Sequence, residues 1–202
     1  SDHAYLPIAL LQEGKIEAAI AGEVVEGPYQ SALQNVADNS LEDKIEVRLA
    51  NGLAAFEPTD GISCITIAGM GGRLIADILA AGLEKLANVS RLVLQPNNRE
   101  DELRDWLVDH DFRIVDEAIL EENEKFYEIL VVEQGSQELT AKELRFGPYL
   151  MREQAPAFVQ KWSKEVEKLA FALEQVPVEN QSARASLEER IAQIKEVLHV
   201  SK

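Results

Sequence analysis

Polar and glycine residues stand at the ends of several apolar runs, and their types suit the binding of a nucleotide. Glu23 closes one run, Asn51 and Gly52 follow a second, and Gln95, Pro96, Asn97 and Asn98 follow a third. A carboxylate accepts hydrogen bonds from both hydroxyls of a ribose, and an amide both donates to and accepts from a base edge. The sequence therefore predicts a nucleoside site, with a solvated carboxylate and ordinary turn amides as the alternatives.

A glycine-rich turn lies in the middle of the chain. The β-branched run over residues 62–67 stops at Gly69, Met70, Gly71 and Gly72, after which apolar residues recur at helical spacing. Three glycines in four residues let backbone N–H groups approach a ligand that side chains would block. The same glycines equally permit close packing of a helix on a sheet, so the turn by itself decides nothing.

These residues require an alternation of strands and helices to position them. Hydrophobic periodicity predicts strands over residues 18–21, 45–49, 62–67 and 91–95, and helices over residues 6–11, 28–36, 73–79 and 99–110. Asn98 is expected to cap the last of these helices. Because open α/β sheets bind ligands beyond the carboxyl ends of their strands, this order places the polar residues at one edge.

Two further strands are predicted over residues 112–120 and 126–132. Only a four-residue acidic and amide link joins those two strands, so they are expected to pair antiparallel. The complete pattern favours the Rossmann-like α/β sheet of class I methyltransferases, whose last strand is antiparallel, over a dehydrogenase fold. Because the first helix has only polar residues before it, we expect the first strand to lie upstream of Ser1.

The character of the chain changes to helical after residue 138. Apolar residues step by three and four from Phe158 to Val176 and again from Ala183 to Leu198. This spacing predicts two amphipathic helices forming an antiparallel coiled-coil hairpin. We therefore divide the chain into a methyltransferase domain, residues 1–138, and a helical coiled-coil domain, residues 139–202. A purely structural role for the hairpin stays open.

Composition limits the classes of function. The 202 residues are 46% hydrophobic and carry a net charge of −16, with no run of apolar residues long enough to span a membrane and no secretory leader. Residues 1–139 have a balance of −17, whereas residues 140–202 have +1. Any contact with nucleic acid must therefore rely on the C-terminal part and a few local arginines. The single cysteine, Cys64, is predicted to be a small core residue of a protein in the reducing cytoplasm.

Several common catalytic and cofactor-binding motifs are absent from the sequence. The chain contains no HExxH, CxxC, P-loop or GxSxG pattern. The central GMGG lacks the spacing of the GxGxxG dinucleotide fingerprint, which argues against NAD. No metal site is expected.

Six segments, taken in order, carry a resemblance to a known family. They are SDHAYLP, AGEVVEGP, NGL, TIAGMGG, QPNNRED and KFYEILVVE. With these segments the chain resembles the TrmK family of bacterial tRNA adenine-N1 methyltransferases over nearly its whole length. Family members place a strand and a D-x-G motif immediately before SDH, and this numbering begins after them.

The resemblance implies S-adenosylmethionine as methyl donor, adenine-22 of tRNA as acceptor, and a role for each matching residue. The implied cofactor-binding residues are Ser1, Asp2 and His3 near the methionine end, Glu23 on the ribose, Val24, Asn51 and Gly52 beside the adenine, and Gly69, Met70, Gly71 and Gly72 along the pocket floor. The implied substrate-binding residues are Gln95, Pro96, Asn97, Asn98 and Arg99, with Tyr5 or Tyr127 stacking on the base. Asp2, as a source of negative potential, and Asn97 or Asn98, which grip the base, are the expected catalytic residues. A helix cap at Asp2 and a structural histidine at His3 are the alternatives.

The expected partner is tRNA, without a membrane or a metal, and a monomer is favoured while the oligomeric state stays open. Six cations of the helical region are expected to contact RNA: Lys142, Arg145, Arg152, Lys161, Lys164 and Lys168. Two other functions stay open. One is a methyltransferase acting on a small molecule, and the other is a non-catalytic module that recruits a partner through its coiled coil.

Overall fold

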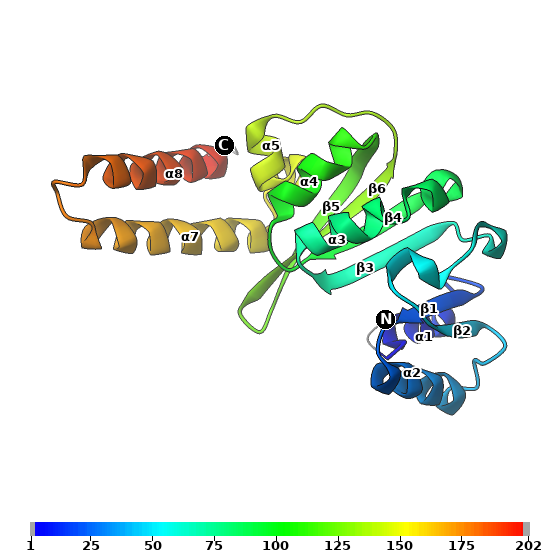
Figure 1. Ribbon diagram of the computed structural model, residues 1–202. Helices are drawn as coiled ribbons and strands as arrows, with labels where there is room; N and C mark the ends of the chain where they lie inside the picture. The colour runs from blue at the N-terminus through cyan, green and yellow to red at the C-terminus, as the bar shows by residue number, and fades with distance from the viewer. Residues whose placement is uncertain (1–2, 200–202) are drawn as a thin grey trace. The chain divides into compact units, whose positions relative to one another are not determined.

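The computed structural model describes residues 3–199, which form two compact units (Figure 1). The first unit runs to Cys64 and includes Ala76–Val89, and the second contains Ile65–Ile75 and continues from Ser90. Ser1 and Asp2 lie outside the described residues, so their expected roles stay predictions.

The first unit is built on a pair of parallel strands. Strand β1 (Ala19–Glu23) pairs with β2 (Ile45–Leu49) in a register that sets Glu23 beside Leu49. Helices α1 (Tyr5–Gln12) and α2 (Glu26–Asp38) pack on this pair. The core consists of small and branched apolar residues: Ala4, Ile8, Ala21, Ala32, Val36, Ile45 and Val47. The unit also holds three short 3₁₀ helices, η1 (Gly52–Ala55), η2 (Pro58–Asp60) and η3 (Leu83–Asn88).

The second unit is built on a four-stranded sheet of order β3-β4-β6-β5. Its strands are β3 (Cys64–Met70), β4 (Arg91–Pro96), β5 (Phe112–Glu122) and β6 (Lys125–Gln134). Strand β6 runs antiparallel to both β4 and β5, which confirms the predicted antiparallel last strand. Asn123 and Glu124, both at positive φ, turn β5 into β6 and match the twist of a tight hairpin.

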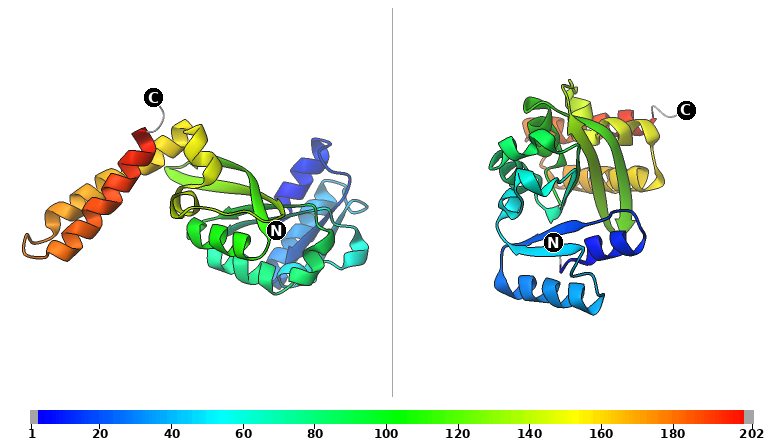
Figure 2. Two further views of the ribbon diagram at one scale, coloured as in Figure 1. Left: turned by 90° about the horizontal axis from the view of Figure 1, so that it is seen from above. Right: turned by 90° about the vertical axis from the view of Figure 1, so that its right-hand side faces the viewer.

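Helices follow or cover this sheet. Helix α3 (Gly72–Ala80) begins after β3, and α4 (Glu100–Asp109) follows β4 with its leucines Leu103 and Leu107 fully buried. The C-terminal part comprises α5 (Ala141–Phe146), α6 (Pro148–Glu153), α7 (Pro156–Gln175) and α8 (Gln181–His199). Figure 1 and the left view of Figure 2 show α7 and α8 lying side by side as a hairpin, as the spacing of their apolar residues predicts.

The apolar stripes of the hairpin join a core at the sheet end of α7 and α8. Phe158 and Trp162 of α7 pack with Phe146 of α5, Leu150 of α6 and Ile194 of α8. Thr140 caps α5 through a reciprocal bond with Glu143, so the helical region begins at a defined residue.

Two expectations about local structure are wrong. Cys64 is exposed, and the other residues of β3 are exposed or half-buried, because β3 is the terminal strand of its sheet with a single neighbour among the described strands. Asn98 does not cap α4, since the N-cap is Arg99 in the left-handed conformation (φ 54°) without a side-chain cap bond.

Candidate active site

Glu23 and Asn51 lie at the same edge of the parallel strand pair. The Ala50 N–H donates a hydrogen bond of 2.8 Å to the Glu23 carbonyl, so Asn51 follows directly beside the end of β1. The Glu23 side chain belongs to a residue that is only 9% exposed, whereas the next residue, Val24, is 61% exposed. This low exposure argues against Glu23 being a freely solvated carboxylate.

Gly52 is required at the start of η1. Its φ of +54° is left-handed, and a Cβ there would meet the Ile78 side chain at 3.0 Å. A carboxylate, an amide and a bare backbone segment at one strand edge fit the ribose and adenine of an adenosine-containing ligand. The first unit thus brings together four residues that the sequence predicts to share a site: Glu23, Val24, Asn51 and Gly52.

His3 lines a shallow pocket at the amino end of α1. The pocket has a volume of about 320 Å³ and is lined by His3, Tyr5, Ser31, Gln34 and Asn35. The His3 carbonyl accepts a bond of 3.0 Å from Asn35 Nδ2, and its buried Nδ1 has no hydrogen-bond partner among residues 3–199. Tyr5, 60% exposed, lies edge-on to the His3 ring at 6.0 Å between centroids. An unpaired buried ring nitrogen argues against a satisfied structural histidine.

The glycine turn after β3 is fixed by amides from the end of β4. Gly69 N–H donates to Gln95 Oε1 at 2.9 Å, and Asn97 Nδ2 donates to the Gly69 carbonyl at 2.8 Å. Asn97 N–H donates to the Met70 carbonyl at 2.7 Å. Gln95 Nε2 then donates to Asn97 Oδ1 at 3.1 Å. Both polar atoms of the Asn97 side chain are therefore used to hold the turn.

Gly71 and Gly72 pack against the following segment of the same site. A Cβ on Gly71 would meet Asn98 Oδ1 at 2.9 Å, and one on Gly72 would overlap the Arg99 carbonyl. Gly72 N–H donates to the Asn98 carbonyl at 2.9 Å. Close packing, the alternative reading of this turn, therefore explains Gly71 and Gly72, while Gly69 (φ 78°) has open space where a Cβ would be.

Asn98 is the amide of this turn that faces a groove with its side chain uncommitted. Within the described part of the chain its side chain makes no hydrogen bond, whereas Gln95 and Asn97 bond to the turn. Arg99 instead pairs with Glu102 at 2.7 Å on the first turn of α4. Of the amides that the sequence predicts to grip a base, Asn98 is the one placed to do so.

The groove beside Asn98 has a volume of about 710 Å³. Its wall combines the two asparagines, two aromatic rings, five cations and three carboxylates: Asn97, Asn98, Phe126, Trp162, Arg145, Lys161, Lys164, Lys168, Arg190, Glu100, Asp101 and Glu165. Sites for organic ligands span about 300–1,000 Å³, so the space suits a nucleotide.

Sequence reasoning chose Tyr127 as a stacking residue, but the groove is lined by Phe126. Neighbouring residues of a strand point to opposite faces, and Phe126 shares its face with Glu128, Leu130 and Val132, which are all buried. That alternation could have identified Phe126. Trp162 was missed as well, because it belongs to a helical stripe that packing alone explains. Arg190 was missed too, and it was not among the cations expected to contact RNA.

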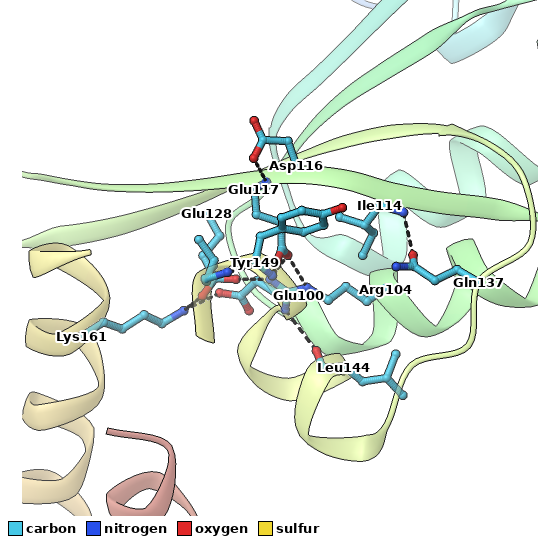
Figure 3. A network of polar contacts seen from close by, with 11 residues as sticks. Glu100, Arg104, Ile114, Asp116, Glu117, Glu128, Gln137, Leu144, Tyr149 and Lys161 are labelled. Atoms are coloured by element: carbon cyan, nitrogen blue, oxygen red, sulfur yellow. Dashed lines mark hydrogen bonds and ion pairs between the residues drawn. The ribbon is translucent and has the colours of Figure 1, made fainter. Parts of the chain in front are cut away.

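A network of buried and half-buried charged side chains extends from the wall of the groove into the second unit (Figure 3). Arg104, fully buried, bonds Glu117 Oε1 at 2.8 Å and Glu128 Oε2 at 2.6 Å. Lys161 Nζ lies 2.7 Å from Glu128 Oε1 and 2.9 Å from Glu100 Oε1. The network therefore links α4, β5 and β6 to α7 through alternating charges.

The ends of α5 and α6 complete this network. Arg104 Nη1 donates to the Leu144 carbonyl at 3.1 Å, and Tyr149 N–H donates to Glu117 Oε2 at 2.9 Å. Burial raises the pKa of Glu117 above its ordinary value, although the Arg104 charge and the Tyr149 N–H oppose that shift. Burial opposes the charged form of Lys161, but Glu128 and Glu100 outweigh it and raise its pKa. The network therefore keeps Lys161 protonated, and its ammonium group is already paired with Glu128 and Glu100.

Two general features of the described residues bear on function. No group of three or more His, Cys, Asp or Glu side chains is placed to hold a metal ion. No helix among them is long and apolar enough to cross a lipid bilayer.

Comparison with known proteins identifies close relatives. The profile of the TrmK family, tRNA (adenine(22)-N(1))-methyltransferase, matches residues 1–196. The tRNA (adenine(22)-N(1))-methyltransferase of Bacillus subtilis (strain 168) is 38% identical over 209 residues, which cover 98% of this chain and 87% of that protein.

Solved structures agree with this match. Streptococcus pneumoniae Sp1610, a candidate tRNA (m1A22) methyltransferase, superposes with a TM-score of 0.96 at 67% identity, covering 98% of this chain and 90% of that one. The same protein in complex with S-adenosyl-L-methionine gives a TM-score of 0.91 at 66% identity, covering 98% and 89%. The fold is the Rossmann-like sheet of class I methyltransferases with a helical C-terminal region, and the chain belongs to the TrmK family of tRNA (adenine(22)-N(1))-methyltransferases.

Proposed function

We propose that this protein transfers a methyl group from S-adenosylmethionine to N1 of adenine-22 in tRNA. The observation that carries the proposal is Asn98, an uncommitted amide on a groove with cationic and aromatic walls, in a chain of the TrmK family. The S. pneumoniae relative binds S-adenosyl-L-methionine, and the B. subtilis relative is named for adenine-22. The proposed substrate also suggests a cytoplasmic location.

The residues of the first unit suit the nucleoside part of the donor. We assign Glu23 to the ribose hydroxyls, Val24 and Asn51 to the adenine, and Gly52 to a close backbone approach. When bound, the donor supplies a methyl group made electrophilic by its sulfonium. His3 Nδ1 is assigned to a polar group of the donor, and Ser1 and Asp2 keep the family roles as predictions.

The chemistry of the acceptor defines what the protein must do. Adenine N1 carries an in-plane lone pair and attacks a methyl group without prior deprotonation, so the protein needs no general base. Its task is to align the nucleophile with the methyl group and to stabilise the cationic product. Because N1 lies on the pairing edge, the base must be unpaired and turned out of its stack.

We assign the second unit to the acceptor. Asn98 grips the adenine edge through its free amide, while Gln95 and Asn97 hold Gly69 and Met70 in place. Phe126 replaces Tyr127 as the aromatic residue beside the base, because Phe126 is the one that lines the groove. The helical region, residues 139–202, is proposed as the tRNA-docking domain next to a methyltransferase domain of residues 1–138.

The direct test uses the whole protein, radiolabelled donor and unmodified tRNA transcripts. Digestion to nucleosides should give 1-methyladenosine from a transcript with adenine at position 22 and none when guanine replaces that adenine. Label in a small molecule from cell extract, with none in tRNA, would support the small-molecule alternative. No label in either would support a recruitment module.

Truncation after residue 138 is a poor test. The helical region supplies the Leu144 carbonyl, the Tyr149 N–H and Lys161 to the buried charges of Arg104 and Glu128. Its removal would take these partners away from Arg104 and Glu128 and expose the buried pair to solvent, which would destabilise the sheet as well. Point variants of the groove separate RNA docking from cofactor binding more cleanly.

A further inference from the structure

The five cations of the groove differ in how far nearby carboxylates neutralise them. Lys161 is held between Glu100 and Glu128, and Lys164 lies 3.2 Å from Glu121 while covering the Phe126 ring at 5.0 Å. Both ammonium groups therefore already have partners. A ligand anion would gain little from them.

Arg145 has a different environment. Its guanidinium lies over the Phe146 ring at 4.9 Å and the Trp162 ring at 5.7 Å, and its Nη1 donates to Gln193 Oε1 at 2.7 Å. Within residues 3–199 no carboxylate oxygen lies within 4.0 Å of it. Arg145 is thus oriented by neutral groups, and its charge is left without a direct counterion.

Arg190 of α8 lines the groove with Arg145. Its nearest carboxylate, Glu165, is 3.5 Å away and is shared with Lys168 at 3.8 Å. Burial and then the charge of Arg190 lower the pKa of Arg145, against the opposing charges of Glu165 and Asp101. Two guanidinium groups that repel each other at the wall of one groove are stabilised when an anion lies between them.

We propose that Arg145 and Arg190 form a binding site for a backbone phosphodiester of the tRNA, in the groove that Asn98 also lines. The proposal rests on the proposed function. A guanidinium presents a planar fork of donors that matches two phosphate oxygens, and Arg145 is held in place by its ring contacts before RNA arrives. A strand gripped at a phosphate by the arginines and at a base edge by Asn98 would be fixed in register.

Salt dependence of tRNA binding is the measurement that separates a phosphate contact from general packing. Each lost phosphate contact should reduce the magnitude of the slope of log K against log salt by about 0.7–0.9. We expect this for R145Q and R190Q with an unmodified tRNA transcript, titrated between about 50 and 200 mM salt. The affinity for tRNA should fall several-fold, while the affinity for S-adenosylmethionine stays at the wild-type value.

Lys195→Gln is the matched control. Lys195 is an exposed cation on the same helix, α8, and does not line the groove, so its loss removes one charge without the proposed contact. Its slope should equal that of the wild type. R145Q also removes packing on Trp162. Should that variant not fold, R190Q decides, since its side chain is 48% exposed.

Unchanged affinity and slope in R190Q and in folded R145Q would overturn the phosphate site. A loss equal to that of K195Q would overturn it too, because it would reflect net charge alone. Either of these two outcomes is compatible with the proposed function, provided that the wild-type protein forms 1-methyladenosine. Failure of the wild type to methylate tRNA would instead refute the proposed function.

Discussion

Arg104 Nη2 lies 2.6 Å from Glu128 Oε2, and both side chains are buried from solvent. Arg104 is on α4 and Glu128 is on β6, so the pair fixes the helix that follows the proposed base-gripping turn. Lys161 of α7 is the second cationic partner of Glu128. Together with Lys161, the pair therefore connects β6 of the sheet, the helix that follows the turn, and α7 of the hairpin.

Removing one member of this pair should be strongly destabilising. We expect Glu128→Gln to lower the free energy of unfolding by about 1.5–3 kcal/mol, because Arg104 and Lys161 would lose the carboxylate that they share in a buried site. Glu117 and Glu100 would remain as their other partners. Chemical denaturation measures the change. Glu122→Gln, an exposed glutamate near the tip of the β5–β6 hairpin, is the control and should be neutral. A loss for E128Q as small as that for E122Q would contradict a structural role of the pair.

The fold could be predicted because its signals are local. The acidic link between β5 and β6 is too short for a crossover, and the apolar residues of α7 and α8 keep one helical spacing, so the hairpins follow directly. The exposure of Cys64 did not follow, because coverage of a strand depends on its place in the sheet and not on its composition.

The site was predicted at the level of segments but not of individual side chains. Asn97 and Asn98 are adjacent and chemically identical, so only the backbone decides which amide holds the turn and which is left without a bond to it. Arg104 was missed, and Lys161 was expected to contact RNA and not carboxylates, since the partners of these two residues are 13–61 residues away in sequence. Pairing over such separations leaves no pattern in a single sequence.

Asn98→Ala tests the proposed grip on the base. We expect kcat/KM for tRNA to fall about tenfold to a hundredfold, corresponding to about 1–3 kcal/mol for a lost hydrogen-bonding partner. The melting temperature should stay unchanged, because the Asn98 side chain makes no bond within the described residues. Asn97→Ala should instead lower the melting temperature, since its amide holds Gly69. Wild-type turnover in N98A would exclude the grip.

Glu23→Gln tests the proposed ribose contact while preserving the shape of the side chain. A neutral amide accepts hydrogen bonds more weakly than a carboxylate, so affinity for S-adenosylmethionine should fall about tenfold or more. Isothermal titration calorimetry measures the change. Glu17→Gln, an exposed glutamate just before β1, should bind the donor normally. Equal affinities in the two variants would remove Glu23 from the site.

Gly72→Ala tests whether the glycine turn depends on close packing. The added Cβ would overlap the Arg99 carbonyl, which is backbone and cannot swing away. We expect destabilisation of about 1–3 kcal/mol, the usual cost of overpacking, together with slower methyl transfer because the Asn98 segment must shift. Gly27→Ala is the control, since a Cβ on Gly27 meets nothing within 4 Å. A thermal melt of G72A that matched that of G27A would show that the turn tolerates a side chain.

Asp60 should contribute to a loss of folding stability at acid pH. Hydrogen bonds from Arg48, and then from the Glu57 N–H, lower the pKa of Asp60 to about 2. A folded-state pKa below the unfolded one, ordinarily about 3.9, means that the stabilisation is complete above the unfolded value. It is then lost as the pH falls from about 4 toward 2. Glu46, whose pKa Arg48 also lowers, acts in the same direction.

Asp60→Asn should remove this pH-dependent contribution. The difference in unfolding free energy between wild type and D60N should be largest near neutral pH and shrink toward zero as the pH falls to about 2, because a protonated Asp60 and an asparagine are both neutral. Denaturation at a series of pH values measures it, and Asp43→Asn, at an exposed position before β2, should run parallel to the wild type. A constant difference between wild type and D60N over that range would mean that Arg48 stabilises Asp60 by hydrogen bonding independent of its charge.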